Sequence, residues 1–214
     1  MDSNQKDDVR SPGRPKNPVS RDHLLEVARG AFAQSGYAGT SMGDIADAVG
    51  LRKSSLFHHF DSKNRLYREV ILSMVSDLDG LVEQLATHEG TFAERLAFLC
   101  ESVVEYLGSR PWAALLVLRE AMDEHIFVQE EGRELLDRTL NRFAAFLGAG
   151  MKDGVFAQDD PHEAALSIVG VHFLHFAASG VSARLLGQDV FTPEMLERWR
   201  RNVTARVLRM VTGR

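Results

Sequence analysis

The spacing of the apolar residues is the feature that most constrains how this chain folds. From Ser20 onward they recur at the three- and four-residue intervals of an α-helix, and strand-like alternation is rare. Pro111, Pro161 and Pro193 stand near the starts of three helical segments, where proline's missing N–H removes no helical hydrogen bond. This pattern predicts an all-α chain of about nine helices.

Capping residues place the first two helices. Ser20 is expected to cap a helix that ends at Gly36, because serine accepts hydrogen bonds from the first turn and glycine tolerates the left-handed exit. A short second helix begins after Thr40 or Ser41. Ser41 and the acidic residue three positions later have capping-box spacing, and Gly50 stops this helix.

The remaining helices follow from the same signals. The third runs from about residue 52 to 59, and Asp61 or Ser62 caps a long fourth helix. Five further helices are expected at approximately 91–108, 111–127, 130–151, 161–182 and 193–212.

Composition excludes several classes of protein. Cys100 is the only cysteine, so no intrachain disulfide is possible and a reducing cytoplasm fits. No uninterrupted apolar run approaches the ~18 residues of a membrane span, and the polar N-terminus lacks the apolar segment of a secretory signal. We therefore expect a cytoplasmic protein with no membrane partner.

The charge is unevenly distributed along the chain. The net charge is −5, which does not favour a nucleic-acid partner. However, residues 1–70 carry 11 Lys and Arg against 9 Asp and Glu, whereas residues 71–214 carry 14 against 21. Because phosphate binding depends on the local face, a DNA-binding N-terminal part remains compatible with an acidic remainder.

Residues 40–66 carry the clearest functional pattern. Ile45 forms the inner face of a short helix, Gly50 allows a turn, and Leu56 and Phe60 anchor the following helix. Two short helices joined by a glycine-containing turn have the form of a helix-turn-helix. The segment therefore predicts a DNA-reading element, the alternative being two packed amphipathic helices without such a role.

The outward residues distinguish these two interpretations. Arg52, Lys53, Ser54 and Ser55 open the second helix of the motif and can donate to bases or phosphates in the major groove. A helix that is merely buried would not need so many cationic and imidazole side chains in one short run, which also includes His58, His59 and Lys63.

The same run resembles the signature of the TetR/AcrR family of transcriptional regulators. The residues that carry the resemblance are Gly50, Leu51, Leu56, Phe57, His58, His59, Phe60, Ser62, Lys63 and Leu66. It implies a three-helix DNA-binding head with a helix-turn-helix, followed by a C-terminal helical bundle for ligand binding and dimerisation. It also implies a homodimeric repressor of a near-palindromic operator, released by a small apolar effector.

The resemblance assigns roles to individual positions. Lys53, Ser54, Ser55 and Phe57 match positions that face the groove, and Thr40, His58, His59 and Lys63 match positions that hold phosphates. The sequence departs from the pattern in having Phe57 in place of tyrosine and Ser54 in place of a frequent glycine. Arg52, where a small residue is common, is a further candidate for a phosphate or guanine contact.

The implied domains are a flexible N-terminal arm at 1–19, a DNA-binding domain at 20–67 and an effector-binding and dimerisation domain at 68–214. Within the arm, Arg14 lies in a Gly-Arg-Pro core that is similar to an AT-hook, in which arginine enters a narrow minor groove. The alternative for the arm is a solvated tail.

The C-terminal part is expected to enclose the effector cavity. Aromatic walls with a few polar groups suit such a cavity. The candidate lining residues are Tyr106, Trp112, Met122, His125, Phe146, His172, Phe173, His175 and Phe176. We expect no cofactor and no metal, although His172 and His175 share a helix face and could ligate one together with Asp123, Glu124 or His125.

Two long helices are the candidates for the dimer interface. Residues 161–182 contain small side chains that allow close helix approach, and residues 193–212 repeat large apolar side chains at helical spacing. A monomer could instead bury both helices in its own core.

Other functional classes find less support. An all-α di-iron enzyme would place glutamate three residues before histidine, and no histidine here has that neighbour. Dinucleotide, phosphate-loop and Gly-x-Ser-x-Gly signatures are absent from the sequence, so we expect no enzyme. The remaining alternatives keep the DNA-binding head but place it under a protein partner, or make the protein an activator.

Overall fold

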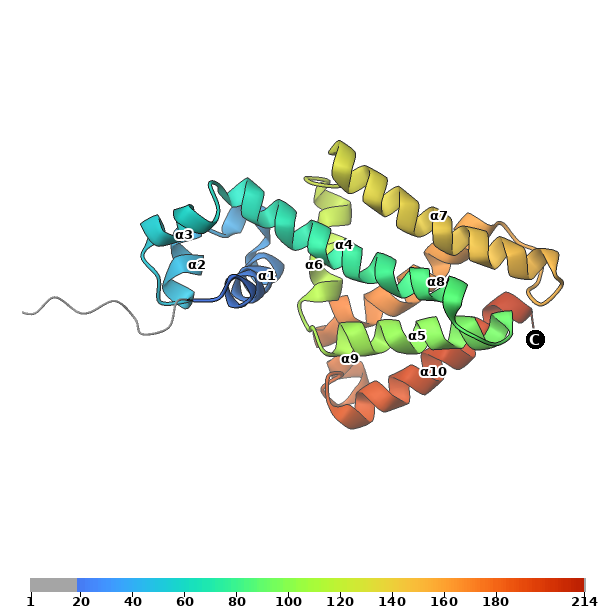
Figure 1. Ribbon diagram of the computed structural model, residues 1–214. Coiled ribbons are helices and arrows are strands. Elements are labelled where there is room, and N and C mark those ends of the chain that lie inside the picture. Colours follow the sequence, from blue (N-terminus) through green and yellow to red (C-terminus); the bar gives the residue numbers. More distant parts are fainter. Residues whose placement is uncertain (1–18, 214) are drawn as a thin grey trace, which may run out of the picture.

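The structure, a computed structural model, describes residues 19–213 and contains ten α-helices and no strand within that range (Figure 1). The all-helical prediction is therefore confirmed. The helices are α1 (Arg21–Gly39), α2 (Met42–Ala48), α3 (Lys53–His59), α4 (Lys63–Thr87), α5 (Phe92–Gly108), α6 (Ala113–Asp123), α7 (Glu130–Lys152), α8 (Pro161–Ala177), α9 (Ser179–Leu186) and α10 (Pro193–Thr212).

The N-terminal caps follow the sequence signals. The Oγ of Ser20 accepts from the N–H of His23, which confirms the start of α1. At α2, Ser41 and not Thr40 is the cap, and a complete capping box joins it to Asp44. At α4, Ser62 is the cap, and its neighbour Asp61 instead forms an ion pair with the next turn of the helix.

Helix α1 is interrupted where the sequence predicted its end. Gly36 leaves the helical conformation at φ 70° and ψ 175°, and a final turn continues to Gly39. A left-handed φ strains residues with a side chain. A Cβ at Gly36 would also lie 3.0 Å from Nη1 of Arg119, so the conformation favours glycine here and a side chain would also displace this guanidinium.

Two predicted helices differ from the observed ones. The segment predicted as one helix at 161–182 forms α8 and α9, which meet at a 77° bend next to Ala178. This break raises the number of helices to ten. Helix α6 ends at Asp123, earlier than expected, because Glu124 adopts a left-handed conformation and the side chain of Glu120 accepts from the N–H groups of Ile126 and Phe127.

The head consists of α1 to α3 and the start of α4, at the left of Figure 1. Its centre is formed by fully buried apolar side chains, among them Leu24, Phe32, Ile45, Leu56 and Phe60. Val19, the last residue of the expected arm, packs against this core. The arm's other residues lie outside the described part of the chain.

The body is built from α4 to α10. Helix α4 runs from the head into the body and packs on α5 and α7, α8 packs on α6 and α7, and α10 lies along α5. The expected boundary between residues 67 and 68 falls inside α4, and α1 also packs on α6. Head and body are thus joined by a continuous helix and by a second helix contact.

No single helix among residues 19–213 has the length and apolar character of a membrane span. Helices α8 and α9 pass that test only as a pair, across their bend.

Candidate nucleic-acid interface and effector cavity

The turn between α2 and α3 has the geometry of a helix-turn-helix. Gly50 adopts φ 68°, and the N–H of Leu51 returns to the carbonyl of Ala46 over 2.8 Å. Leu56 and Phe60 are completely buried and hold α3 against the head. The opposite face of α3 is therefore turned towards solvent.

This outer face brings together most of the predicted DNA contacts. Arg52, Lys53, Ser54, His58 and His59 are exposed, and Ser55 is half-buried. Phe57 is 39% exposed although it is a large apolar residue. Among the described residues, no ion pair engages the two cationic side chains at the start of α3. The face presents donors and one aromatic ring to a partner.

Thr40 and Lys63, which were expected to hold phosphates, make their contacts inside the head. Thr40 is 4% exposed, and its hydroxyl lies 2.8 Å from the carbonyl oxygen of Gly36 and 3.1 Å from that of Ala31. The Nζ of Lys63 donates to the carbonyls of Tyr37 at 2.8 Å and Thr40 at 3.0 Å. These interactions close the end of α1 against the start of α4, which the sequence prediction did not anticipate.

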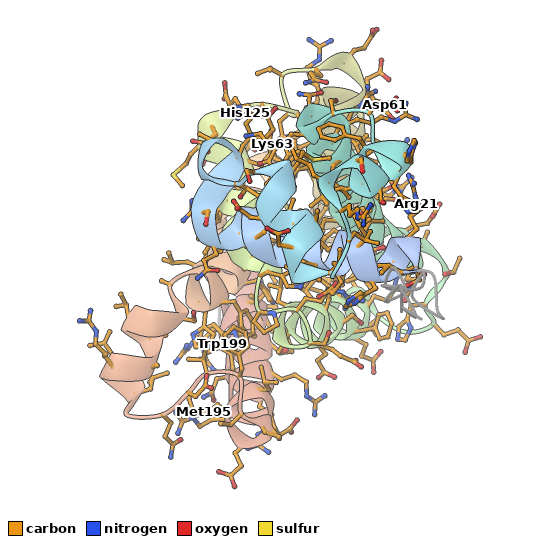
Figure 2. All side chains as sticks on the ribbon, turned by 90° about the vertical axis from the view of Figure 1, so that its left-hand side faces the viewer. Arg21, Asp61, Lys63, His125, Met195 and Trp199 are labelled. Atoms are coloured by element: carbon orange, nitrogen blue, oxygen red, sulfur yellow. The ribbon has the colours of Figure 1, made fainter. Side chains whose placement is uncertain are left out.

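Tyr37 is the centre of this junction. Nζ of Lys63 lies 4.3 Å from its ring centroid, and the rings of Tyr67 and His125 lie 4.9 Å and 4.7 Å away. His125, which was expected to line the cavity, therefore belongs to the contact between head and body, on the same side as Lys63 in Figure 2. The sequence did contain one signal for Tyr37, which is an aromatic residue directly after Gly36, the glycine expected to end the first helix.

Trp112 belongs to the same contact. Its indole N–H donates to Oε1 of Glu26 over 2.6 Å, and the guanidinium of Arg29 lies 5.3 Å from its ring centroid. Both partners are in α1. Trp112 thus ties the start of α6 to the head instead of lining the cavity.

A buried carboxylate lies beside this contact. Glu120 in α6 is completely buried, and its Oε1 accepts from the N–H groups of Ile126 and Phe127. Burial, together with the negative charge of Glu120, raises the pKa of Tyr67 in α4 well above its usual value. Glu120 therefore holds the loop that follows α6 through the N–H groups of Ile126 and Phe127.

An apolar cavity of about 110 Å³ lies between α4, α5, α6, α7 and α8. Of the nine predicted lining residues, His172 and Phe173 line it. The full lining is Val75, Leu78, Val82, Leu99, Cys100, Val103, Val117, Phe127, Leu136, Thr139, Leu140, Phe143, Ile168, Val169, His172 and Phe173. The aliphatic side chains of α4 and α5 were missed because nothing in their spacing distinguishes a cavity wall from ordinary core.

The other predicted lining residues point elsewhere, because they occupy different faces of their helices. Tyr106 donates to Asp77 over 3.2 Å, and Met122 is 74% exposed. Phe146 packs with Phe92 and Phe156, His175 stacks on Trp199 with centroids 3.7 Å apart, and Phe176 lies 5.7 Å from Phe191.

Burial favours the neutral form of two polar groups that line the cavity. Burial lowers the pKa of the His172 imidazole, and it raises the pKa of the Cys100 thiol to about 12. Across residues 19–213, no group of three or more His, Cys, Asp or Glu side chains gathers where it could hold a metal ion. His172 and His175 face different neighbours and do not converge with His125.

The apolar surface of the body is concentrated on α8 and α9. Leu166, Leu174, Val181 and Leu185 are exposed, Leu185 to 82%. Within residues 193–212, Met195, Val203 and Val207 are buried in the same chain, where α10 packs on α5, whereas Met210 is exposed. The participation of α10 in a dimer interface stays a prediction. Figure 2 shows Met195 and Trp199 on α10, away from the labelled residues of the head.

Comparison with known proteins gives matches in both parts of the chain. Residues 24–70 match the family described as bacterial regulatory proteins, tetR family. Residues 93–207 match the family described as tetracyclin repressor-like, C-terminal domain. The two matches cover the head and most of the body.

Individual relatives extend this finding. The chain is 30% identical to the HTH-type transcriptional repressor KstR2 of Mycolicibacterium smegmatis over an alignment of 155 residues. This alignment covers 70% of this chain and 74% of the relative. It is similar to the crystal structure of the TetR family transcriptional regulator PfmR from Thermus thermophilus, with 26% identity, a TM-score of 0.70 and coverage of 88% and 98% of the two chains.

A second solved structure shares the fold. AibR in complex with isovaleryl coenzyme A and operator DNA is 18% identical, with a TM-score of 0.67, and the alignment covers 89% of this chain and 97% of AibR.

Proposed function

Because this chain belongs to the tetR family of bacterial regulatory proteins, we propose that it is a transcriptional repressor that binds a near-palindromic operator as a homodimer and is released by a small apolar effector. The observation that carries the proposal is the outer face of α3, where Arg52, Lys53 and Ser54 are exposed beside a glycine turn. KstR2 of Mycolicibacterium smegmatis, a repressor, is the relative that supports the sign of regulation.

We assign direct DNA contact to α3. Lys53, Ser54, Ser55 and Phe57 would meet base edges in the major groove, with Phe57 placed to touch a thymine methyl. Arg52, His58 and His59 would contact phosphates at its sides. Thr40 and Lys63 are proposed to act indirectly, because they hold α1 and α4 in the positions that present α3. Arg14, outside the described residues, keeps its proposed role in the minor groove.

The homodimer is proposed to form through α8 and α9. These helices expose six leucine and valine side chains: Leu166, Val171, Leu174, Val181, Leu185 and Leu186. These side chains would otherwise remain in contact with water, and their burial against a symmetry mate is favourable. A two-fold axis would set two copies of α3 against two half-sites of a near-palindrome. Because a transcriptional regulator acts where the DNA is, we propose that the protein works in the cytoplasm.

The cavity is the proposed effector site. AibR, which has this fold, is found in complex with both isovaleryl coenzyme A and operator DNA. The cavity of this chain suits the apolar part of such a molecule, because its wall consists almost entirely of aliphatic and aromatic side chains.

Helix α4 provides the coupling between the two sites. Val75, Leu78 and Val82 line the cavity, and Tyr67, further towards the N-terminus of the same helix, is buried against Tyr37 and His125 between head and body. An effector that displaces the cavity end of α4 would therefore tilt the head and change the spacing of the two α3 helices. Effector and operator must then weaken each other's binding by the same factor.

Selection of the purified protein against a randomised duplex library, repeated at several salt concentrations, tests the proposal. We expect a near-palindrome to be enriched, and Lys53→Ala to lose affinity for it. Arg209→Ala, which removes an exposed charge on α10, is the matched control and should retain affinity. Weak binding that fades with salt and enriches no sequence would overturn the proposal.

A further inference from the structure

Helix α8 is apolar on its exposed side as well as on its buried side. Ile168 and Phe173 face the interior of the chain, whereas Leu166 and Leu174 are 59% and 63% exposed. Glu163, near the N-terminus of the helix, is the only Asp, Glu, Lys or Arg in α8. Helices that are apolar on all sides are buried ones. The exposed side of α8 therefore has the composition of a surface that another molecule covers.

A glycine lies at the centre of this exposed side. Gly170 is exposed, and within the described chain a Cβ built on it would meet no atom within 4 Å outside the backbone of its own helix. The packing of the chain on itself therefore does not require glycine at this position. Glycine also destabilises the interior of a helix. What glycine does allow is the close approach of a second backbone.

Two leucines are placed symmetrically about this glycine. Leu166 stands four residues before Gly170 and Leu174 four residues after it, so all three lie on one helix face. If two copies of α8 cross antiparallel about a two-fold axis at Gly170, each position before the glycine meets the position equally far after it. Leu166 of one copy then meets Leu174 of the other, and the same contact occurs twice in the dimer.

The charges of this surface favour antiparallel over parallel helices. Glu163 is exposed on α8, and Arg184, the only Asp, Glu, Lys or Arg of α9, is exposed beyond the corner between the two helices. Neither takes part in an ion pair among the described residues. Parallel helices would place Glu163 beside its own copy, which is unfavourable. Antiparallel helices bring it to the α8–α9 corner of the other copy, towards the opposite charge.

From this pattern we infer that two copies of the chain pack α8 against α8 in antiparallel orientation, with Gly170 at the crossing point and Leu166 against Leu174 of the other copy. The inference rests on the proposed homodimer. It adds the orientation of the two helices, their register and the residue beside the two-fold axis.

Cysteine cross-linking tests the register on the full chain. Three variants each carry one new cysteine: Gly170→Cys, Leu166→Cys and Leu174→Cys. A disulfide requires the two Cα atoms to lie within about 7 Å. In the inferred dimer Leu166 and its own copy are about 12 Å apart along the helix axis, twice the rise over four residues. The wild type, whose single Cys100 is buried, is the control that should not cross-link.

We expect Gly170→Cys to form a covalent dimer by itself after mild oxidation, as measured by non-reducing gel electrophoresis. Leu166→Cys and Leu174→Cys should each stay uncross-linked alone and should form a covalent heterodimer when they are co-expressed with different tags. Cross-linking of Leu166→Cys with itself would show parallel helices and overturn the inference. Absence of the covalent heterodimer from the co-expressed pair would overturn the register.

The size of the side chain at position 170 gives a second readout. Gly170→Leu places a side chain where the two backbones meet, so the dimer dissociation constant should rise about tenfold or more, as expected for overpacking. Gly30→Leu is the matched control on α1, where a Cβ also meets no atom within 4 Å outside the backbone of its helix, and it should leave the constant unchanged. Gly170→Ala serves if Gly170→Leu does not fold. An unchanged constant in the folded variant would contradict close packing at Gly170.

Light scattering of the wild type separates failure of this inference from failure of the proposed function. A dimer whose variants do not give the expected cross-links keeps the proposed function and loses the inferred register. A wild type that is monomeric at every concentration would overturn the proposed homodimer and the inference together.

Discussion

The indole N–H of Trp112 donates to the carboxylate of Glu26 over 2.6 Å, and this hydrogen bond joins the start of α6 to α1. Helix α6 also contributes Val117 to the cavity wall. The head is therefore attached to the cavity by two helices, α4 and α6, and not by the covalent continuation of α4 alone.

Trp112→Phe removes this hydrogen bond while it retains most of the ring. We expect the free energy of unfolding to fall by about 0.5–1 kcal/mol, because Glu26 is partly exposed and can return to water. Trp199→Phe is the matched control, since the indole N–H of Trp199 has no partner within the described chain. Equal losses in urea denaturation of both variants would show that the bond to Glu26 contributes nothing measurable.

Lys53 and Lys63 should differ in the salt dependence of operator binding. Lys53 is exposed on α3 in both protomers of the proposed dimer, so Lys53→Ala removes two cations from the complex. It should weaken binding and reduce the slope of log affinity against log salt by about 2. The amino group of Lys63 is bound to two carbonyls, so Lys63→Ala should leave the slope unchanged and lower stability by about 1–2 kcal/mol. Fluorescence anisotropy at several salt concentrations measures the first effect, and denaturation the second. A reduced slope in Lys63→Ala would restore its expected role at a phosphate.

Glu120 tests the importance of the turn after α6. Glu120→Ala leaves the N–H groups of Ile126 and Phe127 without an acceptor in a buried site, and we expect a loss of about 2–4 kcal/mol in unfolding free energy. Glu120→Gln keeps one acceptor oxygen and should lose less than about 1 kcal/mol. Chemical denaturation compares the two variants. Similar losses would assign the role of Glu120 to its volume and not to its hydrogen bonds.

Leu185 tests the proposed dimer. Its side chain is 82% exposed on α9, and Leu185→Glu would place a charge in the interface. We expect the dimer to dissociate at concentrations at least about 100-fold higher than in the wild type, as for an unpaired charge buried at an interface. Light scattering over a dilution series measures the effect. Val155→Glu, at an exposed apolar residue after α7, is the control that should remain dimeric; an unchanged Leu185→Glu would place the interface elsewhere.

His175 makes stability depend on pH. Burial, and secondly the charge of Arg206, lowers the pKa of His175 to about 4, and burial also lowers the pKa of His172. The unfolded chain therefore binds more protons than the folded one as the pH falls from about 6.5 towards 4. The contribution of the buried imidazole to the free energy of unfolding is therefore complete above pH ~6.5, and it is lost progressively as the pH falls towards 4.

Denaturation at pH 7 and pH 5, at a fixed protein concentration, measures this effect. His175→Gln should retain roughly 1 kcal/mol more of its pH 7 stability at pH 5 than the wild type does, after allowance for partial exposure of the ring. His58→Gln, at an exposed histidine of α3, is the control and should follow the wild type. An equal loss of unfolding free energy between pH 7 and pH 5 in all three proteins would contradict a role for His175.

The sequence by itself determined the helical class, the caps and the DNA-reading motif, because these depend on neighbours within a few residues. Ser20 and Gly50 act through their own turns, and the spacing of Leu56 and Phe60 decides which face of α3 is buried. The family resemblance rests on the same local run, and the comparisons confirm it.

Only the tertiary structure decided which residues meet at a distance. Helical periodicity separates buried from exposed faces, but it does not say which buried face borders a cavity. His125 and Trp112 therefore lie between head and body, and Val75 and Leu78 line the cavity in place of most of the expected aromatic residues. Lys63 likewise binds carbonyls 23 and 26 residues away, a contact that depends on the packing of α1 against α4 and has no local signal.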